Sequence, residues 1–191
     1  MNVNLSWDLF IIVFFGLIVA YSLIIGRNNN IKVILATYVA ALFADAVGNL
    51  FGKTLALSDN FMKLMKLFYI DSPEDATVLV KILMLIVIIV LLSVRGSYNV
   101  DVNKAGPPGV KVGINMLFGF LNACLIVSIA LIFVSGSSFI VGDPIVTSSA
   151  FQDIYSQSNI ARILIDQYSV WFMLPALAFI GISFFSEKTE N

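Results

Sequence analysis

Three polar side chains within a long apolar stretch are the residues best placed to do chemistry. Asp45, Asn49 and Lys53 recur at every fourth position, so a helix would carry them on one face. An unpaired carboxylate in lipid costs about 2.5 kcal/mol or more, so Asp45 needs a partner, water or a proton. One interpretation is a proton- or cation-responsive carboxylate with Asn49 as a neighbouring ligand. The alternative is a structural acid that is hydrogen-bonded to Asn49 or paired with a lysine.

The rest of the sequence offers few groups for catalysis. It contains no histidine, which removes the commonest general base and metal ligand, and its single cysteine, Cys124, cannot form an internal disulfide. No Ser-His or Cys-His pair, phosphate-binding glycine loop or close pair of carboxylates is present. The net charge of −1 gives no field that would attract nucleic acid. We therefore predict a non-enzyme with no catalytic, cofactor-binding or metal-binding residues and no nucleic acid partner.

The polar line lies in the stretch 31–51, which is long enough to cross a bilayer as one helix. A hydrocarbon core of about 30 Å needs roughly 20 helical residues. Small residues recur every fourth position beside the polar line, at Ala36, Ala40, Ala44, Gly48 and Gly52. Such a strip lets a second helix approach closely in lipid. We expect this helix to be the centre of a bundle.

The composition agrees with a membrane protein. The chain is 59% hydrophobic and 12% charged, about half the charged fraction of a soluble domain. Its apolar runs predict spans at about 7–25, 31–51, 76–94, 114–134 and 170–185. The last run is short and contains Pro175, so a re-entrant or interfacial segment is the alternative. The predicted fold class is all-α: one membrane domain, 1–191, forming a polytopic helix bundle of four to five transmembrane helices.

One or two amphipathic helices should lie at the interface beside these spans. The first would start at Asp59-Asn60 and run for about three turns, and its apolar face is too short to cross a bilayer. The second falls within 151–168. Its expected apolar side consists of Ile154, Ile160, Ile163 and Leu164.

Local signals refine the predicted spans. Ser72-Pro73 is a strong helix start, with Ser72 as the N-cap. Lys81, near that end of the third span, is expected to extend its ammonium to the interface. Gly119 and Ala123 form a second pair for close helix packing, and Gly16 with Ala20 could dock on the central helix.

Basic residues suggest an orientation. The predicted turn at 26–30 with the following Lys32, and the connection 95–111, carry five: Arg27, Lys32, Arg95, Lys104 and Lys111. The opposing loops carry four over far more residues: Lys53, Lys63, Lys66 and Arg162. Positively charged loops face the cytoplasm. With five spans, the N-terminus would lie outside and the C-terminus in the cytoplasm of a multi-pass protein in the inner (plasma) membrane.

The order of these features resembles the colicin V production protein family of bacterial inner-membrane proteins. The resemblance rests on Trp7-Asp8-Leu9 before an apolar span, Gly26-Arg27 after it, an alanine-rich second span and Leu117-Phe118-Gly119. It covers about residues 7–134. The family often has an aspartate before the glycine-bearing helix, where this chain has Asn115. The resemblance implies a membrane-embedded accessory protein for export of a peptide toxin or for wider envelope processes.

Two functions follow as alternatives. The first is a membrane scaffold or accessory subunit that assembles with itself or with other membrane proteins, which the small-residue strip favours. The second is a small oligomeric transporter or channel subunit, which the line of Asp45, Asn49 and Lys53 favours. In both cases the lipid bilayer is the surrounding partner.

Overall fold

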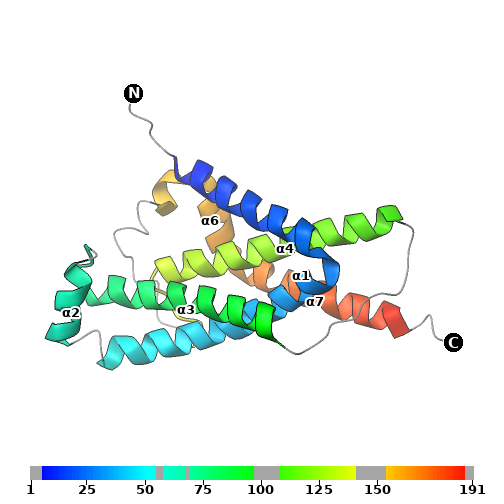
Figure 1. The fold of residues 1–191 in the computed structure, drawn as a ribbon. Coiled ribbons are helices and arrows are strands. Elements are labelled where there is room, and N and C mark those ends of the chain that lie inside the picture. The colour runs from blue at the N-terminus through cyan, green and yellow to red at the C-terminus, as the bar shows by residue number, and fades with distance from the viewer. Residues whose placement is uncertain (1–5, 55–57, 68, 97–107, 141–153, 188–191) are drawn as a thin grey trace.

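The computed structural model describes residues 6–54, 58–67, 69–96, 108–140 and 154–187. The regular elements in these ranges are helices, which confirms the all-helical fold class. In chain order they are α1 (Trp7–Thr54), α2 (Asp59–Lys66), α3 (Pro73–Arg95), α4 (Pro108–Val134), α6 (Asn159–Asp166) and α7 (Tyr168–Glu187) (Figure 1).

Helix α1 is a hairpin of two helical arms joined at one residue. Gly26 has φ 76° and ψ 171°, a backbone conformation that L side chains avoid. The first arm, 7–25, leads into this elbow, and the second arm, 27–54, leads back from it toward the same end of the bundle (Figure 1). The predicted polar turn at 26–30 is therefore too long, because Arg27 to Asn30 already belong to the second arm.

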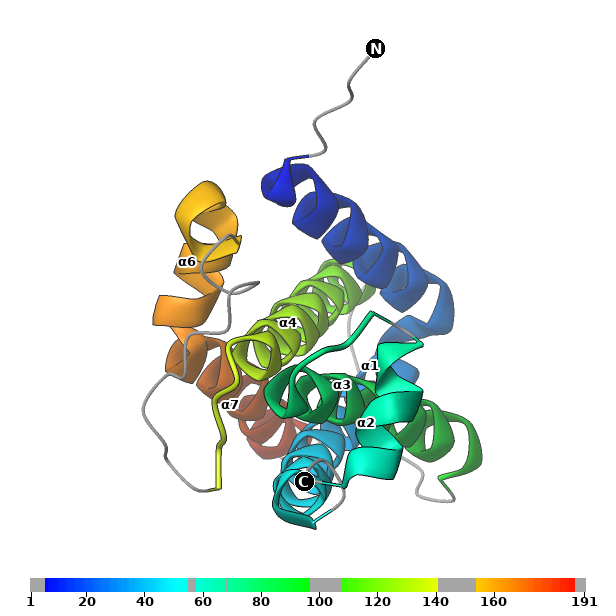
Figure 2. The same cartoon turned by 90° about the vertical axis from the view of Figure 1, so that its left-hand side faces the viewer.

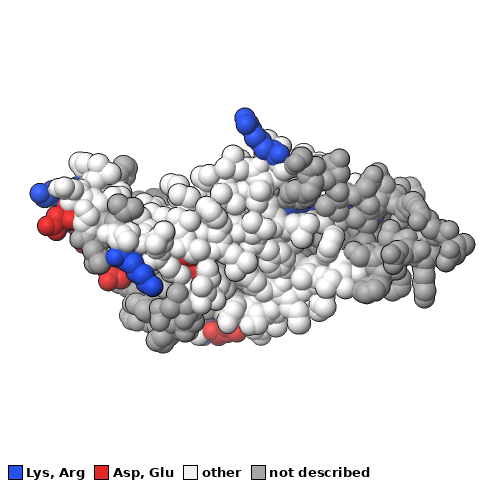
Figure 3. Space-filling view, turned by 90° about the horizontal axis from the view of Figure 1, so that it is seen from below, with Lys and Arg blue, Asp and Glu red and all other residues white. Residues whose placement is uncertain are grey.

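The number of spans differs from the prediction. Among the described residues, three helices are long and apolar enough to cross a membrane: α1, α3 and the Val112–Val134 part of α4. The pair α6 and α7, bent by 66°, would add a fourth if it forms one broken span. The count of four to five is thus not confirmed, and Tyr168–Gly181 of α7 enters the count only together with α6. Charged side chains on the face in Figure 3 gather mainly toward the end that carries α2, and most of the other described surface there is uncharged.

The core lies where α3 and α4 pack against the second arm of α1. Ala40 and Ala44 are fully buried there, beside Leu85 of α3 and Phe118 of α4. Helix α4 lies in the middle of the bundle, between the first arm and α6 on one side and α3, α7 and the second arm on the other (Figure 2). The sequence predicted that 31–51 alone is the centre of the bundle. In the structure, 72% of the most apolar window of α4 is buried, so α4 shares that central position.

The start of α3 is as predicted. Ser72 has extended backbone angles, and its hydroxyl accepts a hydrogen bond from the Asp75 N–H at 3.0 Å. Pro73 occupies the first turn, where its missing N–H costs nothing. Local sequence thus specifies where this helix begins.

The two short helices depart in part from expectation. Helix α2 has eight residues rather than three full turns, and it buries Met65. Helix α6 buries Ala161, Leu164 and Ile165 against the first arm and α4. Of the residues on its predicted apolar side, Leu164 is buried and Ile163 is 52% exposed. Helix α6 is consequently part of the bundle packing.

Candidate functional site

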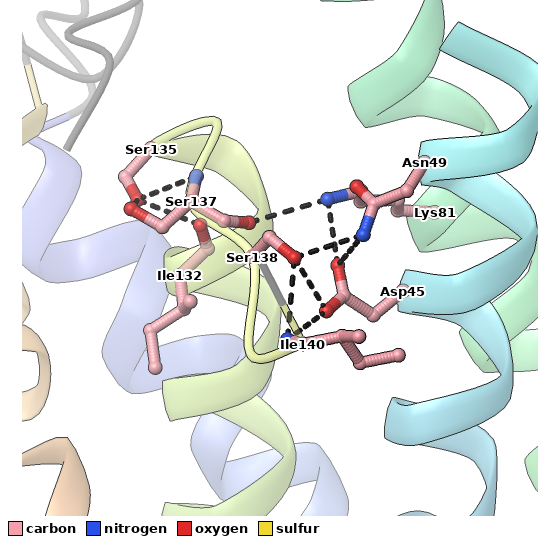
Figure 4. A network of polar contacts seen from close by, with 8 residues as sticks. All are labelled: Asp45, Asn49, Lys81, Ile132, Ser135, Ser137, Ser138 and Ile140. Atoms are coloured by element: carbon pink, nitrogen blue, oxygen red, sulfur yellow. Dashed lines mark hydrogen bonds and ion pairs between the residues drawn. The ribbon is translucent and has the colours of Figure 1, made fainter. Parts of the chain in front are cut away.

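A buried ion pair joins the second arm of α1 to α3. Lys81 Nζ lies 2.7 Å from Asp45 Oδ1, and the two side chains are 3% and 0% exposed (Figure 4). The expectation that Lys81 extends to the interface is wrong. Its ammonium instead turns into the bundle, where the attraction of the carboxylate offsets the cost of burial.

Gly48 makes room for the lysine stem. A β-carbon at this position would come within 2.3 Å of Lys81 Cγ and 2.8 Å of Cε. One turn further along the helix, a β-carbon at Gly52 would lie 3.1 Å from Thr77 Oγ1. The two glycines of the small-residue strip therefore allow α3 to lie directly on the second arm, as close packing in lipid requires.

The segment after α4 completes the polar cluster. Asp45 Oδ2 accepts hydrogen bonds from Ser138 Oγ at 2.8 Å and from the Ile140 N–H at 2.9 Å. Asn49 Nδ2 donates to Ser138 Oγ at 2.8 Å and, weakly, to Asp45 Oδ1 at 3.5 Å. Lys81 Nζ also donates to the Ser137 carbonyl at 3.3 Å. Both carboxylate oxygens and the ammonium are thus bonded within the chain.

The end of α4 explains how this segment returns to the cluster. Ser135 Oγ donates to the Ile132 carbonyl at 2.6 Å, and Gly136 has φ +80°. A positive φ at a glycine is a common way to end a helix. The chain then passes along the second arm, and Figure 4 shows Ser138 and Ile140 facing Asp45.

Chemically, the arrangement is a clamp. It ties α1, α3 and the segment 135–140 together through opposite charges and satisfied hydrogen bonds. Within the described ranges, no group of three or more His, Cys, Asp or Glu side chains could hold a metal ion. Removing one partner of such a pair leaves an uncompensated buried charge, which is strongly destabilising.

The structure unites two of the three predicted polar residues. Asp45 and Asn49 are in the cluster, whereas Lys53 is exposed in the last turn of α1. Lys81 takes the position expected of Lys53, and sequence reasoning missed Ser138 and Ile140. A signal for Lys81 existed: Asp45 lies nine residues before the end of α1 and Lys81 eight after the start of α3. When α3 packs antiparallel on the second arm, with its start beside the end of α1, such positions lie at one level (Figure 1).

The predicted packing residues mostly face neighbours in the same chain. Ala36 and Ala123 are buried, like Ala40, Ala44 and Gly48. At Gly119 of α4, an added β-carbon would come within 3.0 Å of Ser22 Cβ on the first arm.

Polar contacts support this α1–α4 interface. Asn30 Nδ2 donates to Asn115 Oδ1 at 2.9 Å and to the Ser22 carbonyl at 2.8 Å. Asn122 Nδ2 of α4 donates to Ser22 Oγ of the first arm at 3.4 Å. These bonds attach α4 to both arms near the elbow.

Gly16 and Ala20 behave differently from the other small residues. Both are exposed, and no atom of another side chain or element lies within 4 Å of a β-carbon built on Gly16. The prediction that they dock on the second arm is wrong. They line an apolar groove of about 640 Å³ between the first arm, α4, α6 and the start of α7.

The apolar groove has a lining without charged side chains. Besides Gly16 and Ala20, it includes Phe120 and Trp171. The Trp171 Nε1–H is buried and has no hydrogen-bond partner in the described part of the chain. In lipid, acyl chains can cover an apolar surface, but small residues beside a groove allow another helix to approach closely.

Comparison with known proteins identifies no relative: no family model matches this chain, and neither the curated proteins nor the solved structures include a significant match.

Proposed function

We propose that this protein is an integral membrane scaffold or accessory protein of the colicin V production type, which supports toxin export or envelope processes by binding another membrane helix. The apolar groove is the observation that carries the proposal. The sequence resemblance of the chain to that family suggests the role, in toxin export or envelope processes. The groove offers a surface on which the partner helix can bind.

The groove suits a transmembrane helix. Gly16 and Ala20 lie one helical turn apart, and both are exposed on the first arm. Such a pair allows another backbone to approach closely, which is how helices associate in lipid. The other small residues that were predicted to pack helices together are covered by helices of the same chain, so this pair is the part of the predicted packing surface that remains open among the described residues.

The polar cluster favours a scaffold over a transporter. A transport carboxylate must exchange partners during its cycle, whereas both oxygens of Asp45 are bonded to groups of the same chain. The alternative function, a small oligomeric transporter or channel subunit that uses Asp45 and Asn49, draws on the depth at which this charge pair is buried. It predicts that Asp45→Asn alters ion flux at an unchanged protein level, and normal flux would exclude it.

For the topology, we infer five spans. At about 1.5 Å per residue, the first arm is about 28 Å long and the second about 42 Å, so each arm can cross about 30 Å of hydrocarbon with modest tilt or overhang. Helices α3 and α4 add two crossings, and the bent α6–α7 pair adds one. An odd count puts the two termini on opposite sides of the membrane. The basic residues at the elbow and in the connection 95–111 favour an N-terminus outside and a C-terminus in the cytoplasm of an inner-membrane protein.

Cysteine crosslinking in native membranes tests the scaffold proposal. In a Cys124→Ala background, Gly16→Cys places a thiol in the groove. Leu17→Cys is the matched control, because Leu17 is 64% exposed and lies outside the groove lining. A short bismaleimide should link Gly16→Cys, and not Leu17→Cys, to a discrete partner.

Mass spectrometry of the linked product identifies the partner as a second copy or another membrane protein. Filling the groove with Gly16→Leu should reduce secretion of the peptide toxin while the protein level stays normal. Equal linking from both cysteine positions, or full secretion with the filled groove, would contradict the proposal.

A further inference from the structure

A second, polar pocket lies at the elbow of α1. It has a volume of about 470 Å³ and is lined by the elbow residues 25–29 together with Val112 and Asn115 of α4. In Figure 1 the elbow lies toward the same end of the bundle as the end of α3 and the start of α4. It is separate from both the Asp45–Lys81 cluster and the apolar groove.

Arg27 is the charged group of this pocket. Its side chain is half-buried, yet within the described ranges no hydrogen bond or ion pair engages its guanidinium. Partly buried charges in proteins are normally paired, because losing water without gaining a partner is unfavourable. A cation with a free fork of donors beside a cavity is the usual arrangement for binding an oxyanion.

The remaining lining adds neutral amides and no acid. Asn28 and Asn29 follow Arg27, and Asn29 is anchored by its Nδ2–H to the Ile25 carbonyl at 2.9 Å. Asn115 enters from α4, where its Oδ1 accepts from Asn30 and its Nδ2 reaches the Leu23 carbonyl at 3.4 Å. The described lining therefore contains one positive charge and no negative one.

We propose that the elbow pocket binds a phosphate group, held by Arg27. The guanidinium takes two phosphate oxygens in a bidentate manner, and the amides of the pocket wall surround the rest of the group. The elbow is where two spanning arms would leave the hydrocarbon, so the head group of an anionic phospholipid is one source of the phosphate. Free inorganic phosphate is the other. The inference does not depend on the groove or its partner.

Native mass spectrometry of the full chain in detergent tests the proposal with three probes: phosphatidylglycerol, the corresponding diacylglycerol without phosphate, and inorganic phosphate. Arg27→Gln should weaken phosphatidylglycerol binding about tenfold, the size expected for losing a charge-assisted hydrogen-bond pair. Arg95→Gln is the matched control, since Arg95 is exposed at the end of α3. It should leave binding within about twofold, because one exposed charge contributes little.

Each outcome is decisive. Binding of phosphatidylglycerol that depends on Arg27, with none for diacylglycerol, supports a lipid head group. Binding of inorganic phosphate that depends on Arg27 supports a free phosphate. Arg27→Lys, which keeps the charge but not the fork, should fall between wild type and Arg27→Gln. Equal losses in Arg27→Gln and Arg95→Gln, or no loss in Arg27→Gln while its helical content is normal, would overturn the proposal.

Discussion

Gly48 lies directly beneath the aliphatic stem of Lys81, so a β-carbon at Gly48 would overlap Lys81 Cγ at 2.3 Å. We therefore expect Gly48→Ala to destabilise the protein. Overpacking of this kind costs about 1–3 kcal/mol, which offsets or exceeds the gain of about 1 kcal/mol that alanine brings to a helix. Thermal unfolding in detergent, followed by circular dichroism, should show a lower melting temperature.

Gly113→Ala is the matched control for this substitution. Among the described residues, no atom of another element lies within 4 Å of a β-carbon at Gly113, which is exposed on α4. This variant should melt at or above the wild-type temperature. A Gly48→Ala protein that is as stable as Gly113→Ala would mean that α3 shifts freely on the second arm.

The ion pair should show strong coupling. Asp45→Asn or Lys81→Met alone leaves one buried charge without its partner, and each should cost about 3–5 kcal/mol. The double variant removes both charges and should lose much less than the sum of the two. A double-mutant cycle from unfolding in detergent measures this coupling. Lys53→Met, at an exposed site on the same helix, should change stability little.

Strictly additive losses in that cycle would contradict the clamp. They would mean that Asp45 and Lys81 contribute through separate neighbours.

Three N-cap serines form a natural series. Ser58 makes no side-chain cap bond, Ser72 accepts from the Asp75 N–H, and Ser158 both accepts from the Ala161 N–H and donates to Asp8. Alanine should therefore cost near zero at Ser58 and about 1 kcal/mol at Ser72. The loss at Ser158 should be greater, since a bond to a charged group adds about 1.5 kcal/mol or more. Melting temperatures of the three variants rank the effects, and a different rank order would reject the assignment.

The five-span topology predicts labelling from opposite sides. In a Cys124→Ala background, Asn29→Cys and Lys53→Cys place thiols at exposed positions near the two ends of the second arm. A membrane-impermeant maleimide added to intact cells should label position 53. It should reach position 29 only after the cytoplasmic side is opened. Labelling of both from one side would mean that the second arm does not cross.

Features set by neighbouring residues were predictable from the sequence. The start of α3 depends on Ser72 and the residues that follow it within one turn, and it was confirmed. The burial of the small-residue strip depends on helical periodicity, and it also appears in the structure. The elbow was located by Gly26, but its length was overestimated because one glycine with positive φ is enough to reverse the helix.

Features set by distant residues were not predictable in the same way. The partner of Asp45 is on another helix, 36 positions along the chain, and the other ligands of its carboxylate follow α4. The sequence around Lys81 alone favours a side chain that extends to the interface. Its counter-charge comes from Asp45, which only the antiparallel packing of α3 on the second arm brings close. The face of Gly16 was misassigned for the same reason: which neighbour covers a helix face depends on the whole bundle.

The single-residue elbow also bears on how the protein is made. Gly26 is the only non-helical residue of α1, so no loop separates the first arm from the second. If both arms cross, they must leave the insertion machinery together as a preformed hairpin. The first 54 residues would thus be a single unit of biogenesis, onto which the later helices assemble.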